Sequence, residues 1–359
     1  MRPQWQPQTV IGCMSGTSCD GVDAVVLSWD AAQRPRILAH VGHDWGDLAT
    51  EVRAYADGAA ISAAACRNLM RDIAQAHMQA ITQLPASLRA QAELLVVHGQ
   101  TVYHAPPLSW QMIDAPWLAA QLGLPVLHDL RSADLAAGGQ GAPITPLADA
   151  ELFPGEGRRA VVNLGGFINL TLLDNAAVVG GRDVCLANQL LDRAARLWLQ
   201  QAYDRDGTCA TSGQVHQEAS AQLVAELVAQ YQGRSLGTAD QTSPWLSQWH
   251  PRLSAADALA SICHAIAQCV QAQCAQDAPH TLWLAGGGVA NAALVAAIRR
   301  ACSGMRVASS AEAGIPPQQR EAAAMAILAR RLAMGQAITL PAVTGCRGPA
   351  PIGASWAFP

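Results

Sequence analysis

Two segments of the chain share one plan, and this repetition constrains the fold more than any other feature. In each segment an apolar run typical of a β-strand enters a turn of Gly, Asn, Ser, Thr or Asp, and a second apolar run follows. The first segment covers residues 8–29 with a turn at 16–21, and the second covers residues 158–174 with a turn at 163–166. We therefore expect two β-hairpins, one opening each half of the chain.

The rest of the chain mixes strand-like runs with longer helical patterns. A third glycine turn, at 286–288, follows the strand-like residues 281–284 and opens a helix-like run over 291–301. Apolar periodicity predicts further helices over residues 62–83, 115–122, 187–202, 216–231, 255–275 and 320–334. Strands mixed with long helices, with a hairpin opening each half, predict an α/β protein of two similar lobes.

A turn-rich stretch near the middle of the chain suggests where the lobes divide. Residues 129–146 contain three glycines and two prolines. We predict an N-terminal lobe of residues 1–129, joined by the tail at about 346–359, and a C-terminal lobe of residues 130–345. The alternative is one continuous domain with a long surface loop.

Composition excludes several classes of protein. With 14% charged residues and a formal net charge of −4, the chain is poorly suited to disorder, to a coiled coil or to a nucleic-acid-binding face. All 23 basic residues are arginine, so a Walker-type phosphate loop, pyridoxal phosphate and Schiff-base chemistry are excluded, because each needs a lysine amine.

Cysteine usage and hydropathy favour a cytoplasmic protein. The ten cysteines form no C-x-x-C pair. The start of the sequence lacks the apolar core of a signal peptide, and the longest uncharged stretch, at 258–276, contains His264 and several glutamines and is a poor membrane span. We expect no membrane partner and no nucleic-acid partner.

The hairpin turns are candidate phosphate-binding sites. A turn of Gly, Ser and Thr presents backbone N–H groups and hydroxyls without bulky side chains. Asp20 and Asp23 flank the first turn and could hold Mg²⁺ through water, since magnesium prefers oxygen ligands and keeps part of its hydration shell. The turn at 286–288 is no dinucleotide fingerprint, because it lacks the later glycine of G-x-G-x-x-G.

Other motifs are weaker candidates. Residues 233–237 fit the hydrolase pattern G-x-S-x-G, but they follow a helical run instead of a strand, which argues against a serine hydrolase. His98, His104 and His128 match no familiar metal-binding spacing. Asp183 precedes the helix expected from residue 187, so its carboxylate is either an N-cap or a base facing the site.

Six segments together resemble the motifs of one family, the anhydro-N-acetylmuramic acid kinases. They lie in family order along nearly the whole chain, at residues 12–23, 98–106, 129–143, 163–169, 286–291 and 340–345. The resemblance implies the two-lobed actin-like ATPase and hexokinase-type sugar-kinase fold, with ATP in the interlobe cleft. It also implies an ATP- and Mg²⁺-dependent kinase, with a homodimer as the assembly.

The implied reaction opens 1,6-anhydro-N-acetylmuramic acid with water and phosphorylates the freed 6-oxygen from ATP, as a step of peptidoglycan recycling. In such a reaction a carboxylate activates the water, as in inverting glycosidases, and the phosphoryl transfer needs alignment and charge neutralisation.

The resemblance also implies roles for individual residues. Asp183 matches the catalytic base, Arg131 matches the partner of the substrate's lactyl carboxylate, and His98, Gln100 and Thr101 match further sugar-binding positions. ATP and its phosphates are expected at Ser15, Gly16, Thr17, Ser18, Cys19, Asp20, Gly21, Val22, Asp23, Asn163, Gly165, Gly166, Asn169, Gly286, Gly287 and Gly288.

Two segments depart from the family pattern. Residues 183–188 keep the first and last positions of the family's Asp-Thr-Gly-Pro-Gly-Asn motif, but Cys185 and Ala187 replace its two glycines. Residues 234–239 differ from the family's Lys-Ser-Thr-Gly-Arg-Glu. The alternatives to an active enzyme are therefore a catalytically impaired paralogue that binds nucleotide or sugar, and a related kinase with another sugar substrate.

Overall fold

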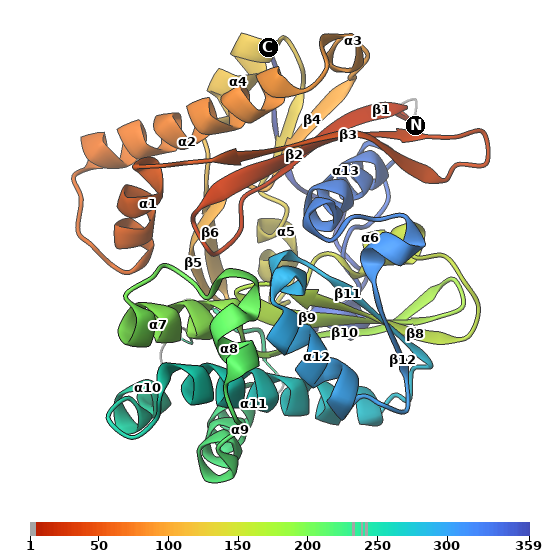
Figure 1. Cartoon of the computed structure of the whole chain (residues 1–359). Coiled ribbons are helices and arrows are strands. Elements are labelled where there is room, and N and C mark those ends of the chain that lie inside the picture. The colour runs from red at the N-terminus through yellow and green to blue at the C-terminus, as the bar shows by residue number, and fades with distance from the viewer. Residues whose placement is uncertain (1–4, 232–233, 238–239, 241–242) are drawn as a thin grey trace. The chain divides into compact units, whose positions relative to one another are not determined.

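The computed structural model describes residues 5–231, 234–237, 240 and 243–359. It divides into two compact units, each built around its own β-sheet (Figure 1). Unit 1 consists of Met1–Pro154 and Gln318–Pro359, and unit 2 consists of Gly155–Pro317.

Unit 1 contains the first predicted hairpin. Its strands are β1 (Thr9–Met14), β2 (Gly21–Trp29), β3 (Pro35–Asp44), β4 (Leu94–Val97), β5 (Gln100–Ala105), β6 (Leu108–Met112), β7 (Val126–His128) and β13 (Ser355–Ala357). Its helices are α1 (Leu48–Ala56), α2 (Ala63–Gln83), α3 (Ala86–Arg89), α4 (Ala115–Leu122), α5 (Ser132–Ala136), α6 (Pro146–Leu152), α13 (Arg320–Ala333) and α14 (Pro341–Thr344).

The main sheet of unit 1 has the order β13-β7-β4-β1-β2-β3, and β5 and β6 form a separate hairpin. Helix α2 covers one face of this sheet and α13 covers the other (Figure 1). The alternation along β1 explains this: Ile11 and Cys13 join the core beneath α2, whereas Gly12 faces α13. A Cβ atom at Gly12 would lie 2.2 Å from the carbonyl oxygen of Ala322, so only glycine lets β1 and α13 approach this closely.

Unit 2 contains the second predicted hairpin and the third glycine turn. Its strands are β8 (Arg158–Leu164), β9 (Phe167–Asp174), β10 (Ala177–Leu186), β11 (Thr281–Ala285) and β12 (Arg306–Ser309). Its helices are α7 (Asn188–Leu199), α8 (Thr208–Ser212), α9 (Gln217–Tyr231), α10 (Pro244–Trp249), α11 (Ala255–Ala275) and α12 (Ala292–Ala301), with short 3₁₀ turns at Arg205–Gly207, Gly287–Ala290 and Ser310–Ala313.

The sheet of unit 2 repeats the topology of unit 1. Its order is β10-β9-β8-β11-β12, with β8, β9 and β10 antiparallel and with β11 and β12 parallel to β8. In unit 1, β1, β2 and β3 are likewise antiparallel, and β4 and β7 run parallel to β1. This repetition confirms the predicted α/β class and the actin-like ATPase and sugar-kinase fold.

The division between the units differs from the predicted boundary near residue 130 and from its return near residue 345. The turn-rich stretch remains in unit 1, because α6 packs against α13 and Arg131 bonds within the unit. In the structure, unit 1 resumes at Gln318 and includes α13 as well as the C-terminal tail.

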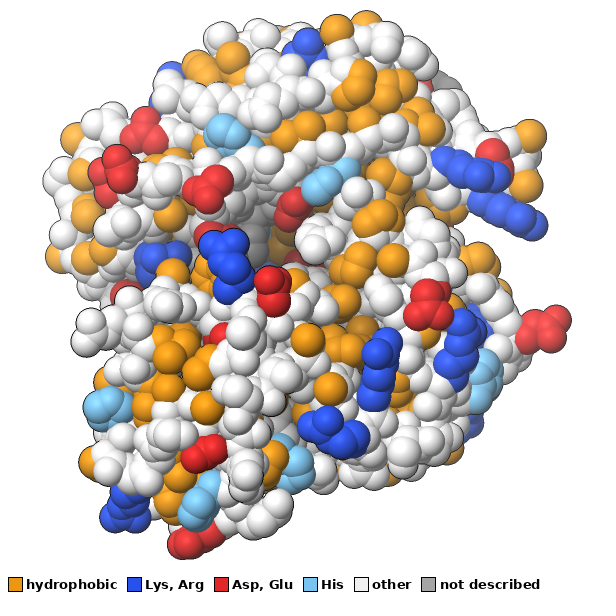
Figure 2. All heavy atoms as spheres, in the orientation of Figure 1, with side chains coloured by type: hydrophobic (Ala, Val, Ile, Leu, Met, Phe, Trp, Pro, Cys, Tyr) orange, Lys and Arg blue, Asp and Glu red, His pale blue; other side chains and the backbone are white. Residues whose placement is uncertain are grey.

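On the face drawn in Figure 2, basic and acidic side chains are interspersed, and no single-sign patch dominates that view. Within the described ranges, no helix combines the length and apolar character that a membrane crossing requires.

Candidate functional site

The first hairpin turn joins β1 to β2 and begins with a buried hydroxyl. Ser15 is 1% exposed, and its Oγ has no hydrogen-bond partner among the described residues. The turn closes through a hydrogen bond from the Cys19 N–H to the Gly16 oxygen, at 3.1 Å, and Cys19 adopts a left-handed conformation at φ 53°. A non-glycine residue rarely adopts this conformation except where surrounding contacts enforce it, and such residues cluster at functional sites.

Three side chains or backbone groups from other elements hold this turn in place. The Gln100 amide donates from Nε2 to the Gly16 oxygen at 3.1 Å and to Cys19 Sγ at 3.2 Å. Arg53 of α1 donates from Nη2 to the Ser18 oxygen at 2.9 Å, and the Trp45 N–H donates to the Asp20 oxygen at 3.0 Å. The predicted phosphate-binding turn is therefore an anchored loop.

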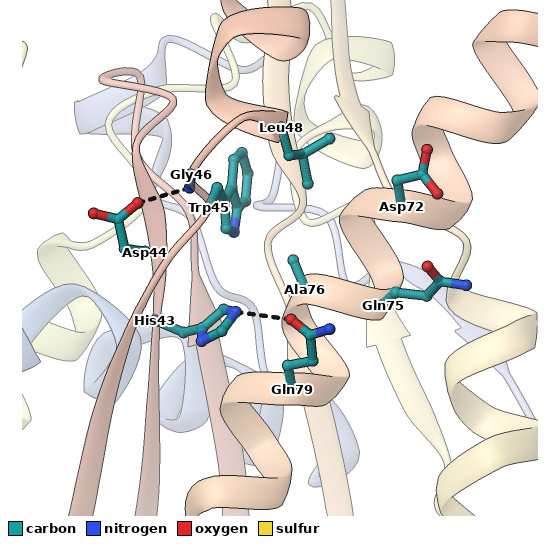
Figure 3. A pocket seen from close by; sticks show the side chains of 9 residues that line it. All are labelled: His43, Asp44, Trp45, Gly46, Leu48, Asp72, Gln75, Ala76 and Gln79. Carbon is teal, nitrogen blue, oxygen red and sulfur yellow. Dashed lines mark hydrogen bonds between the residues drawn. The ribbon is translucent and has the colours of Figure 1, made fainter.

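A hollow of about 400 Å³ lies next to the residues that anchor the turn, between the end of β3, the start of α1 and the middle of α2 (Figure 3). Two hydrogen bonds join groups of its lining: His43 contacts Gln79 at 2.9 Å, and the Gly46 N–H donates to Asp44 at 2.7 Å. Trp45, which bonds to the turn, forms part of its wall. We interpret the residues around this hollow as part of the structure that holds the turn in place.

Asp20 lies at the end of the turn, just before β2, and Asp23 lies on β2. Asp20 is exposed and accepts a hydrogen bond from Ser18 Oγ at 2.5 Å, whereas Asp23 contacts His40 Nε2 at 2.8 Å. Across the described part of the chain, no three His, Cys, Asp or Glu side chains gather closely enough to hold a metal ion. Two carboxylates beside the predicted phosphate-binding turn have the oxygen ligands that Mg²⁺ prefers, and would suit an ion held partly through water.

Arg131 is fixed from two sides within unit 1. Its Nε donates to His98 Nε2 at 3.0 Å and its Nη1 donates to the Gly141 oxygen at 2.5 Å. His98 is 2% exposed, and its other ring nitrogen bonds to the Gly99 oxygen at 2.9 Å. Both ring nitrogens of His98 thus have partners inside the protein, so His98 supports Arg131. Thr101, also predicted as a sugar-binding residue, lies on β5 and accepts a hydrogen bond from Gln111 at 3.3 Å.

Three buried histidines in unit 1 make stability depend on pH. Burial lowers the pKa of His77 to about 4, that of His98 to about 3 and that of His104 to about 4. The unfolded chain binds a proton at each near pH 6.5, whereas the folded chain does not. As the pH is lowered from 7.5 to 5, we expect the free energy of unfolding to decrease. Below pH 6.5 the decrease should be about 1.4 kcal/mol per pH unit for each histidine.

Urea unfolding at pH 7.5, 6 and 5 measures this dependence. His77→Met removes one titrating ring and should reduce the slope by about one proton. A slope that is the same with His77→Met as with the natural chain would contradict the prediction.

The second hairpin turn, in unit 2, packs against the third glycine turn. Gly286 adopts φ +85°, and a Cβ atom there would lie 2.7 Å from Asn163 Oδ1. A Cβ atom at Gly288 would lie 2.8 Å from Leu164 Cβ. Because side chains at these two glycines would collide with the hairpin, the sequence places glycine where the two turns meet. The predicted residues of both turns are thus brought together.

Asp183 stands in a polar row across the sheet of unit 2. It lies opposite Asn169 of β9, which in turn lies opposite Asn163 of β8. Residues directly opposite on antiparallel strands point to the same face, and this face is opposite to the one that Val162 and Leu170 bury in the core with α11. Asn169 Oδ1 is buried without a hydrogen-bond partner among the described residues.

The structure excludes one of the two interpretations of Asp183. The residue lies inside β10, and the N-cap of α7 is Ala187, so Asp183 does not cap that helix. It is 7% exposed, and its Oδ2 accepts hydrogen bonds from the Leu236 N–H at 2.7 Å and from Ser235 Oγ at 3.3 Å. A nearly buried carboxylate in a polar row beside two candidate phosphate turns is suited to act as a base.

Comparison with known proteins decides the family. The chain matches the family model for anhydro-N-acetylmuramic acid kinase over residues 8–357. It is 39% identical to the anhydro-N-acetylmuramic acid kinase of Synechococcus sp. (strain CC9605), over 96% of this chain and 98% of that protein. It is 37% identical to the protein of the same name from Bordetella petrii, over 96% and 95% of the two chains.

The chain belongs to the anhydro-N-acetylmuramic acid kinase family. Among solved structures, a ROK family glucokinase from Streptomyces griseus covers 90% of this chain and 99% of its own, with a TM-score of 0.44 and 14% identity.

The departures from the family's motifs are accommodated locally. Cys185 and Ala187 have no positive φ, and Ala187 lies at φ −137°. The two residues that replace the motif's glycines therefore carry no left-handed strain, and a register shift between Asp183 and Cys185 changes the backbone there. Of the second altered segment, residues 234–237 are described, and Thr238 and Ala239 lie outside the described residues. Gly233, the first residue of the hydrolase-like pattern, also lies outside the described residues. The serine of that pattern, Ser235, donates a hydrogen bond to Asp183.

One acidic residue of this family member was missed by the sequence analysis. Glu321 lies in the first turn of α13, where burial raises its pKa against the opposing effect of Arg320. Asp23 and Asp149 raise that pKa further, whereas Arg131 lowers it. Glu321 therefore belongs to the electrostatic environment of the predicted Mg²⁺ and sugar-binding residues. Its signal in the sequence is an Arg-Glu pair that opens an otherwise apolar, alanine-rich helix.

Proposed function

We propose that this member of the family is an ATP-dependent kinase that converts 1,6-anhydro-N-acetylmuramic acid and water into N-acetylmuramic acid 6-phosphate, in peptidoglycan recycling. The observation that carries the proposal is the Asp183 carboxylate. It is held in a polar row beside the hairpin turn at 163–166, against which the turn at 286–288 packs. This arrangement provides a base next to groups that can bind phosphate.

The reaction needs one base and one phosphoryl acceptor. The oxygen of water bonds to the anomeric carbon while its proton passes to Asp183, and the bond from that carbon to the 6-oxygen breaks. The 6-oxygen then bonds to the γ-phosphorus of ATP, and the bond from that phosphorus to the bridging oxygen breaks, which releases ADP. Asp183 acts as the carboxylate of an inverting glycosidase does.

The phosphoryl half of the reaction depends on alignment and on neutralisation of charge. In unit 1 the backbone of residues 15–23 and the buried Ser15 hydroxyl would bind phosphate oxygens. In unit 2 the corresponding groups are Asn163, Gly165, Gly166, Asn169 and the backbone of residues 286–288. The buried oxygens of Ser15 and Asn169, for which the described part of the chain offers no hydrogen-bond partner, support this assignment.

Asp20 and Asp23 would hold Mg²⁺ through water. A bound magnesium ion would neutralise phosphate charge. Asp20 is exposed and Asp23 is partly exposed beside the turn, which supports the assignment.

Arg131 would bind the lactyl carboxylate of the sugar, because a planar guanidinium matches two carboxylate oxygens. The bonds to His98 and Gly141 orient that guanidinium. Gln100 holds the phosphate turn through Gly16, which gives it a supporting role. Thr101 is proposed as a further sugar contact. The homodimer and the cytoplasmic location remain predictions.

One experiment tests the whole proposal. The purified protein is mixed with 1,6-anhydro-N-acetylmuramic acid, ATP and Mg²⁺ in oxygen-18-labelled water, and the sugar product is followed by mass spectrometry. We expect a phosphorylated sugar with one heavy oxygen at the anomeric carbon, because water opens the ring there.

Other products would point elsewhere. A phosphorylated sugar without the heavy oxygen would remove water, and with it the role of Asp183, from the ring opening. No sugar product, with ATP still bound, would favour the impaired paralogue or a kinase for another sugar.

A further inference from the structure

The Asp183 side chain contacts a segment far away in the sequence. Its Oδ2 accepts two hydrogen bonds from the segment at 234–237, one from the Ser235 hydroxyl at 3.3 Å and one from the Leu236 N–H at 2.7 Å. The strand fixes only the backbone of Asp183. Its carboxylate is oriented by these donors, and their own position therefore matters to the base.

An ion pair fixes the segment that supplies these donors. The Arg234 guanidinium binds both carboxylate oxygens of Asp240, at 2.8 Å from Nη1 to Oδ2 and through a second contact from Nη2 to Oδ1. Asp240 Oδ2 also accepts the Gly237 N–H at 2.9 Å, and Arg234 Nη1 donates to the Ser235 oxygen at 3.0 Å. Arg234 and Asp240 thus bracket Ser235 and Leu236.

The pair is built for rigidity. Asp240 is 7% exposed, and although burial favours its neutral form, the hydrogen bonds from Arg234 and Gly237 lower its pKa, so it is ionised. The hydrogen bond to Asp240 likewise raises the pKa of Arg234. A bidentate pair with one buried partner restricts geometry more than a single exposed contact does.

We propose that the Arg234–Asp240 ion pair positions the catalytic base, by holding the Leu236 N–H and the Ser235 hydroxyl against the Asp183 carboxylate. This inference rests on the proposed function of Asp183. It makes Arg234 and Asp240 positioning residues that touch neither substrate, and it gives a role to a segment in which the chain departs from the family's motif.

The ion pair orients the Asp183 carboxylate relative to the bound substrate and does not contact the substrate itself. Its loss should therefore lower kcat and leave KM nearly unchanged. Both oxygens of Asp240 accept hydrogen bonds from Arg234 or Gly237, so in Asp240→Asn the amide NH₂ would face a hydrogen-bond donor and one of these contacts would be lost. We expect kcat to fall about 10- to 100-fold, because a displacement of the order of 1 Å can cost this much. KM for the sugar and for ATP should change less than about twofold.

Conservative variants separate positioning from general damage. Arg234→Met should match Asp240→Asn, whereas Arg234→Lys keeps one charged contact and should recover part of kcat. Ser235→Ala removes the longer of the two bonds and should lower kcat only a few-fold. Glu312→Gln is the control, because it breaks an exposed ion pair with Arg306 in the same unit and keeps the side-chain length of the capping box.

The outcomes distinguish this inference from the proposed function. If the natural chain does not phosphorylate the sugar, the proposed function fails. If it does, and Asp240→Asn keeps its kcat or loses activity through a raised KM, the positioning inference is wrong. A crystal structure of Asp240→Asn provides a readout without turnover: an Asp183 carboxylate that has moved or has two conformers supports the inference, and an unchanged one overturns it.

Discussion

Asp183→Asn is expected to lower kcat by about two to four orders of magnitude and to leave the dissociation constant of ATP within about twofold of the natural value. The amide is nearly the same size as the carboxylate, and its oxygen can still accept the Leu236 N–H at the position that the carboxylate occupies. What the amide lacks is basicity, so it cannot take the proton of the attacking water. The loss should therefore appear in kcat and not in binding.

Steady-state kinetics with the anhydro sugar, together with calorimetric titration of a non-hydrolysable ATP analogue, measure the two quantities separately. Asp174→Asn is the matched control: it makes the same change of charge at the end of β9 in the same sheet, where Asp174 pairs with the half-exposed Arg158. Full activity of Asp183→Asn would remove Asp183 from the mechanism. Loss of nucleotide binding together with activity would mean that the carboxylate supports the phosphate turns instead.

The hairpins could be predicted from the sequence because their signal is local. A run such as Ala160–Val162 or Val25–Leu27 favours a strand, and the glycines and asparagines between two such runs favour a tight turn. Both hairpins and the turn at 286–288 are confirmed. The glycine at 286 is required by a neighbour more than a hundred residues away, so its conformation was not predicted.

The environment of the candidate site could not be predicted, because it depends on contacts between distant segments. The altered segment at 234–237 carries no local signal of its contact with Asp183, and the hydrolase-like pattern around Ser235 was informative only as a pattern to reject. His98 was assigned to the sugar, but its burial and its bond to Arg131 are properties of the folded unit. The boundary near residue 130 differs for a similar reason: turn composition marks irregular backbone and not the limit of packing.

The buried ion pair between Arg320 and Asp149 gives the largest expected effect on stability. Both side chains are fully buried; Arg320 donates from Nε to Asp149 Oδ1 at 2.7 Å and from Nη2 to Thr145 Oγ1 at 2.9 Å. A positive side chain at the start of α13 is unfavourable for the helix dipole, so it is the tertiary contact with α6 that accounts for Arg320.

Asp149→Ala is expected to destabilise the protein by about 3–5 kcal/mol, because it leaves a buried guanidinium without its counter-charge. Urea unfolding followed by circular dichroism measures the loss. The more exposed pair of Arg36 and Asp30 is the control. Asp30→Ala should cost less than Asp149→Ala, because water screens this pair and can replace Asp30 as the acceptor of the two backbone N–H groups that it binds. A cost for Asp149→Ala no larger than that of the control would contradict the prediction.

The double variant Arg320→Met with Asp149→Leu separates the ion pair from the packing around it. Removing both charges also removes the cost of taking them out of water, so the double variant should be more stable than either single one. Arg320 lowers the pKa of Glu321 more strongly than Asp149 raises it, so removing both charges should still let the pKa of Glu321 rise. The ion pair therefore links the packing of α13 under the first hairpin to the charge on an acidic group near Asp23 and Arg131, and a stability measurement alone would miss that second effect.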